Sequence, residues 1–588
     1  MFGSKKLKSF FSSSLRTPKH LAIGLISIYS GLKIISYIRS RLHNRRLLSK
    51  AKKKLKSKLS QQFTFPQVSE ETQQYILSLT VCELSQAIKS QKLSSVSVMS
   101  TYCQRAYNIG RSLNLTAEEC FKEALLEAEK CDEETSKGHS RGPLHGVPIS
   151  IKDHLEMLGY TSSVGLICKL DNPDTKTANI IELLKSQGAI PFVRSNVPQG
   201  IMWIECSNKI YGRAENPWDR SRIPGGSSGG ESGLVSSRSS PLGIGSDIGG
   251  SIRVPCSFCG VYGFRVTPQR LSFHGVKTPD FGDSGGLDFV LYPSFGPIGR
   301  CVDDLILFMK TWLCPEMNIK DKTIVNLPFD CEVLDDKRKL KIGYFYDSGI
   351  YKAAECYVGA IDKCCERLRD KYEIVKFDVP NCKEIFITFF RLLNTCGNIP
   401  MLDAMQGEDP EDYYKVPIFM CDHPYLFSMI FALMRKIGWN RVVDILQTDI
   451  NISAEDYVTL FRRLIRQIDE TIHAWESAGL DALICPAVGV VAPEHGKSDI
   501  LISLIFCSIW NVVRFPSGNV PVGLVKKNEA FYEDSYHDAF TECSKVAMED
   551  SEGLPYGIQV VTLPYKDELA LKVMKDVEDV FKFHSFPL

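Results

Sequence analysis

The stretch PGGSSGGESGLVSSRSSPLGIGSDIGGSIRVPCSFCG, residues 224–260, decides the fold of this chain. It holds ten glycines and ten serines among its 37 residues, and it has no lysine or histidine. Such a composition is most often that of a flexible linker. Here, however, aliphatic residues recur along the stretch: Leu234, Val235, Leu242, Ile244, Ile248 and Val254. Because such side chains are usually buried, the stretch is predicted to pack against a core.

Two catalytic interpretations fit its serines. Gly225–Gly229 matches G-x-S-x-G, the nucleophile elbow of α/β-hydrolases, which needs a strand before it and a histidine later in the chain. Residues 220–224 do not have a strand pattern, and no later histidine has a distinctive setting. The second interpretation pairs this loop with residues 247–253, in which two glycines precede Ser251. Glycines let backbone N–H groups converge on one point, so a serine there would have an oxyanion hole beside it.

The two loops, together with a segment upstream, resemble the amidase signature family. Three segments carry the resemblance: GVPISIKD at 146–153, GGSSGG at 225–230 and GSDIGGSIR at 245–253. Residues 481–486 and 555–560 are similar to that family's late motifs, so the resemblance covers roughly residues 80–580. It implies an α/β fold in which helices surround one large mixed central sheet.

The resemblance also implies a Ser–Ser–Lys triad. Ser251 would be the nucleophile that accepts the acyl group, Ser227 would relay the proton, and Lys152 would be the base. The Gly226–Ser227 peptide would be cis. The implied substrate-contacting positions are Ser227, Ile201 (where the resembled enzymes tend to have methionine) and the four residues of the oxyanion hole: Ile248, Gly249, Gly250 and Ser251. No metal and no organic cofactor is implied.

A lysine can act as a base only when it is neutral, and its free pKa is about 10.4. Burial away from carboxylates lowers that value. Lys152 ends a predicted strand, in which neighbouring side chains point to opposite faces, so Asp153 is expected to point away from the amine. Asp247 and Arg253 are expected to be structural partners of the loop, and Ser228 to form hydrogen bonds within it.

Composition argues against several other classes of function. The chain has 588 residues and a net charge of +1, so charge gives no case for nucleic-acid binding. Its 20 cysteines are scattered, which fits a reducing compartment. The one CxxC, Cys256–Cys259, has no second pair at zinc-finger spacing, so packed thiols are expected there rather than a metal.

The amino-terminal segment, residues 1–38, contains an apolar run that is predicted to be a transmembrane helix, Leu21–Ile38. Eighteen helical residues span about 27 Å, close to the hydrocarbon core of about 30 Å. An interfacial helix and a cleavable signal peptide are the alternatives. Ten Lys and Arg lie at 39–58 and five before the run, so the positive-inside rule places the body in the cytosol.

This pattern predicts a single-pass protein of an intracellular membrane, such as the endoplasmic reticulum. A basic linker is expected at 39–79, in which the run Lys50–Lys58 is solvated and touches anionic lipid, and the catalytic domain is expected at 80–588.

Hydrophobic periodicity predicts alternating strands and helices in the body. Strands are expected at 146–152, 189–193, 340–344, 482–485 and 557–561, and helices at 354–370 and 454–478. Thr116–Glu119 has the form of a capping box, which predicts that a helix begins there.

Within the family, the chain resembles the animal fatty acid amide hydrolases. The amino-terminal helix and the segments NVPQ at 196–199, CSN at 206–208 and NPW at 216–218 carry this resemblance. It implies a membrane-bound serine hydrolase that cleaves N-acylethanolamines and primary fatty amides, and it makes a homodimer plausible. The alternatives are a hydrolase of a non-lipid amide and an inactive, lipid-binding relative.

A membrane cap is implied by the same resemblance. Apolar residues fall at helical spacing around 426–437, and five of them are assigned to the cap: Leu426, Phe427, Ile430, Phe431 and Met434. Periodicity alone favours a helix that faces the core. The resemblance and the basic residues at 435, 436 and 441 favour contact with a bilayer.

Overall fold

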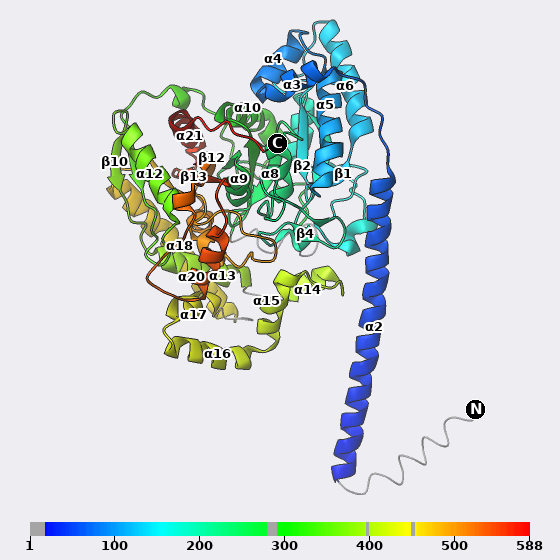
Figure 1. The fold of residues 1–588 in the computed structure, drawn as a ribbon, viewed down its shortest axis with the longest axis vertical. Coiled ribbons are helices and arrows are strands. Elements are labelled where there is room, and N and C mark those ends of the chain that lie inside the picture. Colours follow the sequence, from blue (N-terminus) through cyan, green and yellow to red (C-terminus); the bar gives the residue numbers. More distant parts are fainter. Residues whose placement is uncertain (1–17, 279–290, 395–398, 448–452, 588) are drawn as a thin grey trace, which may run out of the picture.

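The computed structural model describes residues 18–278, 291–394, 399–447 and 453–587 (Figure 1). For residues 18–34, 36, 37, 394 and 399–401 it describes the backbone alone. A long helix, α2 (Pro18–Ser60), runs down one side of the body and projects beyond it (Figure 1).

Eleven strands of the described residues form one sheet, in the order β1-β3-β2-β6-β8-β7-β12-β13-β11-β9-β10. In that order their bounds are Thr116–Glu119, Ile190–Ser195, Pro148–Lys152, Gly243–Asp247, Ser294–Gly299, Tyr262–Arg265, Ser517–Leu524, Pro555–Val561, Ala482–Pro486, Lys341–Tyr344 and Glu373–Lys376. A separate hairpin joins β4 (Ser207–Asn208) to β5 (Gly212–Arg213).

The sheet is mixed. β2 pairs in parallel with β3 and β6, and β9 pairs in parallel with β10 and β11. The strands between these two groups, from β6 through β8, β7, β12 and β13 to β11, pair antiparallel. The predicted α/β fold with a large mixed central sheet is therefore confirmed, and the strands expected from periodicity are found within two residues of their predicted bounds.

Helices cover the sheet, which explains why its central strands are buried along their whole length. Besides α2, the α-helices in chain order from α3 to α21 are Glu70–Ser78, Val81–Lys89, Ser95–Arg105, Phe121–Ser136, Asn179–Ser186, Gly229–Ser236, Arg253–Cys259, Val302–Trp312, Pro315–Lys320, Glu355–Leu368, Cys382–Asn394, Ile399–Met405, Asp412–Asp422, Pro424–Lys436, Asn440–Leu446, Ala454–Ser477, Ile505–Val512, Ala539–Met548 and Asp567–Phe581. Two of them position the site: α8 (Gly229–Ser236) packs on β2 and β6, and α9 (Arg253–Cys259) packs on β7, β12 and β13.

The capping box at Thr116–Glu119 is a wrong prediction, because these residues form strand β1 and the helix begins later, at Phe121. The Thr116 hydroxyl donates to Glu119 Oε1 at 2.9 Å and accepts from Lys58 Nζ at 2.8 Å. Thr116, which the local pattern would assign to a helix cap, is therefore bound by Lys58, 58 residues earlier in the chain.

Residues 50–58 of the expected linker are helical and packed rather than solvated. Lys54 Nζ lies 2.5 Å from Glu118 Oε1, and Ala51 is buried in a small cluster with Ile210 and Tyr211. Lys58 is itself buried against β1. The carboxyl-terminal half of α2 is thus docked on the body, which corrects the expectation for residues 50–58. The predicted domain boundaries themselves stay predictions.

The predicted membrane span, Leu21–Ile38, lies in the backbone of α2, and most of its side chains fall outside the described residues. Across the helices that are fully described, none alone is long and apolar enough to cross a bilayer, whereas α15 and α16 pass that test only as a pair bent by 99°. The transmembrane helix therefore stays a prediction.

Candidate active site

Three loops meet at one edge of the sheet. Lys152 ends β2, Ser246 and Asp247 end the neighbouring parallel strand β6, and Ser227 and Ser228 immediately precede α8. Because β2 and β6 are parallel, their carboxyl ends lie side by side, which brings residues from three separate segments together.

Lys152 is the centre of this cluster. Its Nζ lies 2.8 Å from Ser227 Oγ, 2.9 Å from Ser228 Oγ, 2.9 Å from Ser246 Oγ and 3.3 Å from Ser246 O. A neutral amine has two N–H donors and one lone pair, so it can donate to Ser246 and Ser228 while it accepts the proton of Ser227. Sequence reasoning missed Ser246, although its place directly before Asp247 in the second loop was a usable signal.

Burial lowers the pKa of Lys152 to about 7. The charges of Cys206, Asp247 and Glu231 act in the opposite direction but do not outweigh the loss of hydration. In the described part of the chain the amine forms no ion pair with a carboxylate. A large fraction of Lys152 is therefore neutral at ordinary pH, as a base requires.

The carboxylate of Asp153 points away from that amine, as the strand alternation predicted. Its Oδ2 accepts hydrogen bonds from Ser163 Oγ at 2.6 Å and from the N–H of Val164 at 2.9 Å. Its other oxygen lies 3.8 Å from Arg194 Nη2.

The peptide between Gly226 and Ser227 is cis, as predicted. A Cβ at Gly226 would lie 2.4 Å from the carbonyl oxygen of Trp203, and one at Gly225, whose φ is +84°, would lie 2.6 Å from Cα of Pro255. Both positions need glycine because backbone from two other segments packs directly against them.

The loop that carries Ser251 is held by Asp247. The Asp247 carboxylate accepts from the N–H of Gly250 at 2.8 Å and of Ile252 at 3.1 Å, and both of its oxygens lie 3.1 Å from the Arg253 guanidinium. Asn511 Nδ2 adds a fourth partner at 2.8 Å. The predicted structural role of Asp247 and Arg253 is confirmed by this geometry.

These hydrogen bonds to Asp247 show that Gly250, one predicted member of the oxyanion hole, does not belong to it. The N–H of Gly250 is already donated to Asp247, so it is not free to bind a substrate oxygen. In the described structure no hydrogen bond uses the N–H groups of Ile248, Gly249 and Ser251, and these three residues are partly exposed whereas Gly250 is buried. The ring of Phe389 on α13 (Cys382–Asn394) packs directly on Gly249, because a Cβ added to Gly249 would lie only 2.5 Å from Phe389 Cζ.

A backbone hydrogen bond links Ser251 to the cluster around Lys152. Its carbonyl oxygen accepts from the N–H of Ser228 at 3.1 Å, which ties the loop after β6 to the loop before α8. The structure thus brings Lys152 and Ser227 into contact and places Ser251 next to them. The catalytic roles of the three residues stay predictions.

Ile201 ends a short 3₁₀ turn, η3 (Gln199–Ile201), and is partly buried with φ of +52°. Two residues later, Trp203 places its carbonyl against Gly226. Sequence reasoning missed the support of this turn, in which Gln199 Nε2 donates to Glu408 Oε1 at 2.7 Å and Tyr414 Oη donates to the Gln199 carbonyl at 2.7 Å.

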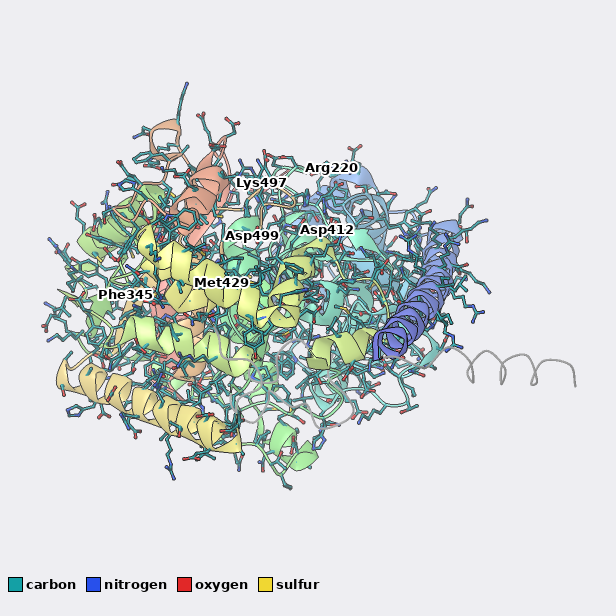
Figure 2. The ribbon with its side chains drawn as sticks, turned by 90° about the horizontal axis from the view of Figure 1, so that it is seen from below. Arg220, Phe345, Asp412, Met429, Lys497 and Asp499 are labelled. Atoms are coloured by element: carbon teal, nitrogen blue, oxygen red, sulfur yellow. The ribbon has the colours of Figure 1, made fainter. Side chains whose placement is uncertain are left out.

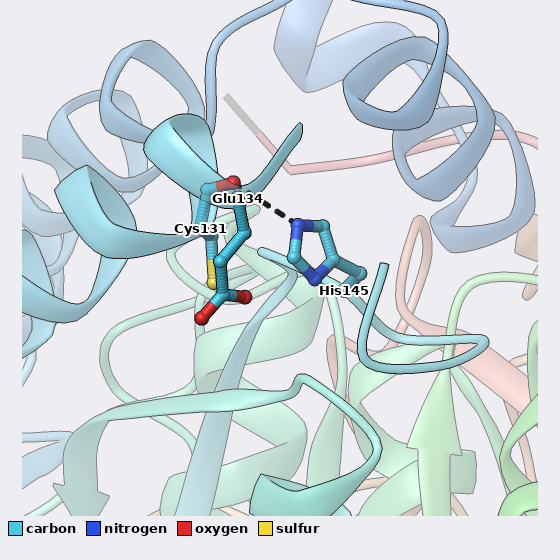
Figure 3. A group of neighbouring side chains, drawn as sticks. All are labelled: Cys131, Glu134 and His145. Atoms are coloured by element: carbon cyan, nitrogen blue, oxygen red, sulfur yellow. Dashed lines mark hydrogen bonds between the residues drawn. The ribbon is translucent and has the colours of Figure 1, made fainter. Parts of the chain in front are cut away.

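Among the residues that the structure describes, one group of side chains has the spacing of a metal site: Cys131, Glu134 and His145 (Figure 3). The ring nitrogens of His145 and the carboxylate of Glu134 are already engaged. The His145 ring accepts from the N–H of Arg141 through Nδ1 and lies 3.1 Å from Cys131 O through Nε2, and both Glu134 oxygens bind the Arg141 guanidinium. Burial raises the pKa of the Cys131 thiol to about 11. The donor set therefore fits a structural hydrogen-bond network and not a metal.

Helix α15 (Asp412–Asp422) and helix α16 (Pro424–Lys436), on which the predicted membrane-cap residues lie, are at the lower end of the body, on the side toward which α2 projects (Figure 1). Seen from below, α16 crosses the face with Met429 on it (Figure 2). We call the exposed apolar residues of this region the cap face: Val416, Phe419, Tyr425, Leu426, Met429, Leu433 and Ile437.

Only one of the five predicted cap residues, Leu426, belongs to the cap face. Phe431 is buried and points inward, while Phe427, Ile430 and Met434 are partly buried. α16 packs on α17 (Asn440–Leu446) and α15, and Phe427 contacts Phe419 of α15. A helix that is apolar on nearly every side gives no signal for which side faces outward.

Comparisons with known proteins find similar chains and a similar fold. A family model described as Amidase matches residues 97–571. Fatty-acid amide hydrolase 1 of Sus scrofa is 30% identical over 511 residues, covering 86% of each chain. An amidase of Gibberella moniliformis is 31% identical over 509 residues, covering 86% of this chain and 88% of that one. A solved structure of a fatty acid amide hydrolase, 23% identical, superposes with a TM-score of 0.78 over 92% of this chain and 95% of that one, which shows a shared fold.

Proposed function

Since the chain belongs to the amidase signature family and is an amide hydrolase by that membership, we propose that it cleaves fatty acid amides at a membrane surface. The substrates would be N-acylethanolamines and primary fatty amides, and the products a free fatty acid and an amine. The observation that supports the chemistry is the contact of 2.8 Å between Lys152 Nζ and Ser227 Oγ, with no carboxylate paired to the amine among the described residues.

In the first half-reaction, neutral Lys152 takes the proton of Ser227 as Ser227 takes the proton of Ser251. The Ser251 oxygen attacks the amide carbonyl, and the N–H groups of Ile248, Gly249 and Ser251 receive the negative charge that develops on the carbonyl oxygen. The C–N bond then breaks. The leaving amine receives its proton from Ser227, which regains one from Lys152, and the acyl group stays on Ser251 as an ester.

In the second half-reaction, water attacks that ester. Ser227 and Lys152 accept the water proton and return it to Ser251, so the fatty acid leaves and the enzyme is restored. Each cycle thus consumes one amide and one water and releases one acid and one amine. Because Ser227 and Lys152 carry the proton, this mechanism does not use a histidine. No described histidine hydrogen-bonds Ser227 or Ser251, which disfavours the α/β-hydrolase elbow.

A lipid substrate is supported by the cap face. Its apolar side chains are exposed on the side toward which α2 projects, so one bilayer could receive both (Figure 1). Hydrolysis of a non-lipid amide is the second candidate, and the Gibberella relative named simply as an amidase favours it. An inactive lipid-binding relative is disfavoured by the Lys152–Ser227 contact.

The proposal places the body on the cytosolic side of an intracellular membrane, through the predicted span Leu21–Ile38. A homodimer is expected from the family resemblance alone. Carbonate extraction of membranes tests the anchorage, because an integral protein stays in the pellet. Light scattering of detergent-extracted protein measures the mass and so tests the dimer.

A fluorophosphonate probe tests the chemistry, since it transfers its phosphonyl group to an activated serine with loss of fluoride. Mass spectrometry of the wild-type protein should place the adduct on Ser251, and Ser251→Ala should not be labelled. Lys152→Ala should be labelled more slowly. An adduct on Ser227 would instead support the nucleophile elbow, and absence of any adduct would support the inactive relative.

The lipid assignment is tested by turnover. Purified enzyme in vesicles is given a long-chain N-acylethanolamine and, separately, a water-soluble short-chain amide. Preference for the long-chain substrate, measured as kcat/KM, supports the proposal, and preference for the soluble amide supports the second candidate.

A further inference from the structure

A carboxyl group that the mechanism does not use lies inside the wall of the site. Glu231, in the first turn of α8, is fully buried. Its Oε2 accepts a hydrogen bond from Ser150 Oγ at 2.5 Å, and the Ser195 hydroxyl and the N–H of Ile244 also face the carboxyl. Ser150 and Lys152 are two residues apart on β2, so their side chains share one face of the strand. The same contact of β2 with α8 that brings Ser227 to Lys152 therefore also brings Glu231 to Ser150.

The burial of Glu231 favours the protonated acid over the carboxylate. A protonated Oε2 can donate to Ser150 Oγ, which can then donate its own proton to the Leu242 carbonyl 3.3 Å away. Each proton in this chain has an acceptor. Burial of an ionised carboxylate is costly, and the hydrogen bonds from Ser150, Ser195 and the N–H of Ile244 offset only part of that cost. Burial accordingly raises the pKa of Glu231 to about 7.

The groups that face Glu231 come from three strands. They are Ser150 and Lys152 on β2, the Ser195 hydroxyl on β3 and the N–H of Ile244 on β6. From α9, Arg253 is bound to Asp247 and is thereby neutralised. The charge of Lys152 acts on Glu231. The effect is mutual, because Glu231 also acts on Lys152, alongside the larger effects of Cys206 and Asp247.

We propose that Glu231 is a positioning residue that governs whether Lys152 can act as a base. While Glu231 holds its proton and donates to Ser150, the amine of Lys152 can be neutral; when Glu231 ionises, its negative charge retains the proton on Lys152. Only a proton moves between these states, and it is exchanged with solvent. The inference rests on the proposed function, because it concerns the base of that reaction.

Glu231→Gln tests the inference. The amide can make the hydrogen bond of the neutral acid but can never ionise. The measurement is the second-order rate constant of Ser251 with a fluorophosphonate, as a function of pH. The pH of half-maximal rate should fall by about one unit, because a negative charge near the amine is removed, and the plateau rate should stay within about threefold. A midpoint that is unmoved or higher, or a plateau that falls more than tenfold, overturns the inference.

Glu408→Gln is the matched control. Glu408 is also a buried carboxyl whose pKa burial raises to about 7, but it pairs with Gln199 and the N–H of Ile167 instead of facing Lys152. Its variant should leave the midpoint where it is, and an equal shift in both variants overturns the inference. If wild-type Ser251 is not labelled at all, the proposed function fails first. If it is labelled and the Glu231→Gln midpoint matches wild type, only this inference fails.

A second measurement does not depend on Glu231→Gln folding. Coupling between two titrating groups is reciprocal, so removal of the amine must act on Glu231. In Lys152→Met, infrared difference spectra across the pH range should show a protonated carboxylic acid that persists to higher pH than in wild type. A carboxylic acid band that titrates identically in both proteins overturns the inference.

Discussion

The amine of Lys152 lies 2.8 Å from the hydroxyl of Ser227, while the carboxylate of Asp153, the next residue, binds Ser163 on the opposite side of the strand. Strand alternation separates the two neighbours. The lysine is left in a buried cluster of hydroxyls, where an uncharged amine is favoured over an ammonium ion.

Replacing Lys152 with alanine should lower kcat/KM for amides by about 10²–10⁴, the usual contribution of a general base. The pH profile is the sharper readout. Since only the neutral amine is active and its pKa is about 7, wild-type activity should rise as pH increases through that value. Initial rates between pH 5 and pH 9 check this, and the rise should be absent from the variant. A rise retained near pH 7 in Lys152→Ala would assign it to another group.

Ser227→Ala should impair amide cleavage more than cleavage of the matching ester. An amine leaves only after it has been protonated, and Ser227 would deliver that proton, whereas an alcohol is a better leaving group. A loss of about 10²-fold or more on the amide is expected. Ser228→Ala is the control, because Ser228 also contacts Lys152 but hydrogen-bonds the Ser246 carbonyl at 3.2 Å. Parallel kcat/KM measurements on both substrates decide, and equal losses in the two variants would remove the relay role.

The roles of the glycine- and serine-rich loops could be predicted from sequence because the order of their residues resembles the amidase signature, and some positions also have a local reason. Glycines at 225 and 226 precede the serine, and Asp247 precedes Ser251 by the distance that lets one carboxylate cap the loop. The donor set could not be predicted in full. Whether Gly250 offers its N–H to substrate or to Asp247 depends on the path of the backbone, and no residue type in the motif encodes that choice.

Asp247→Asn should lower the free energy of unfolding by about 3–5 kcal/mol, because it leaves the buried guanidinium of Arg253 without its counter-ion. Asp303→Asn is the control: its ion pair with Lys575 is exposed, and such pairs contribute less than about 1 kcal/mol. Urea unfolding of the three proteins at pH 7 measures the difference. If Asp247→Asn lowered the free energy of unfolding as little as Asp303→Asn does, the structural role of the Asp247–Arg253 ion pair would be contradicted.

The same substitution predicts a pH dependence. Burial by itself would raise the pKa of Asp247, but Arg253, Arg265 and Asn511 outweigh it and hold the pKa well below its ordinary value. A carboxyl with a depressed pKa adds stability above the pKa of about 3.9 that it has in the unfolded chain, and that stability is lost as the pH falls toward the folded-state value. The urea midpoints of wild type and Asp247→Asn should therefore converge in acid.

Long-range contacts set the limit of sequence reasoning elsewhere in the chain. The basic run at 50–58 has the composition of a solvated segment, yet Lys58 is buried because Thr116 on a distant strand supplies its partner. Likewise, helix α16 has apolar residues on nearly every side, so its outward face is decided by what packs on the inward one. Neither Thr116, the partner of Lys58, nor the helices that pack on α16 can be predicted from the sequence around those segments.

The orientation of α16 makes the membrane proposal testable at single residues. Leu433 on the cap face is 60% exposed, and Leu126 on α6 (Phe121–Ser136), at the other end of the body, is 58% exposed (Figure 1). Leu433→Glu should weaken binding to anionic vesicles and lower kcat/KM for a long-chain amide by about tenfold, since a charge opposes burial in the interface. It should spare a short soluble amide. Leu126→Glu places the same charge at an equally exposed site and should change neither property. Vesicle sedimentation and turnover of the two amides measure both effects. Equal behaviour of the two variants would show that the cap face does not meet the bilayer, whereas loss of the soluble activity in Leu433→Glu would point to a damaged fold.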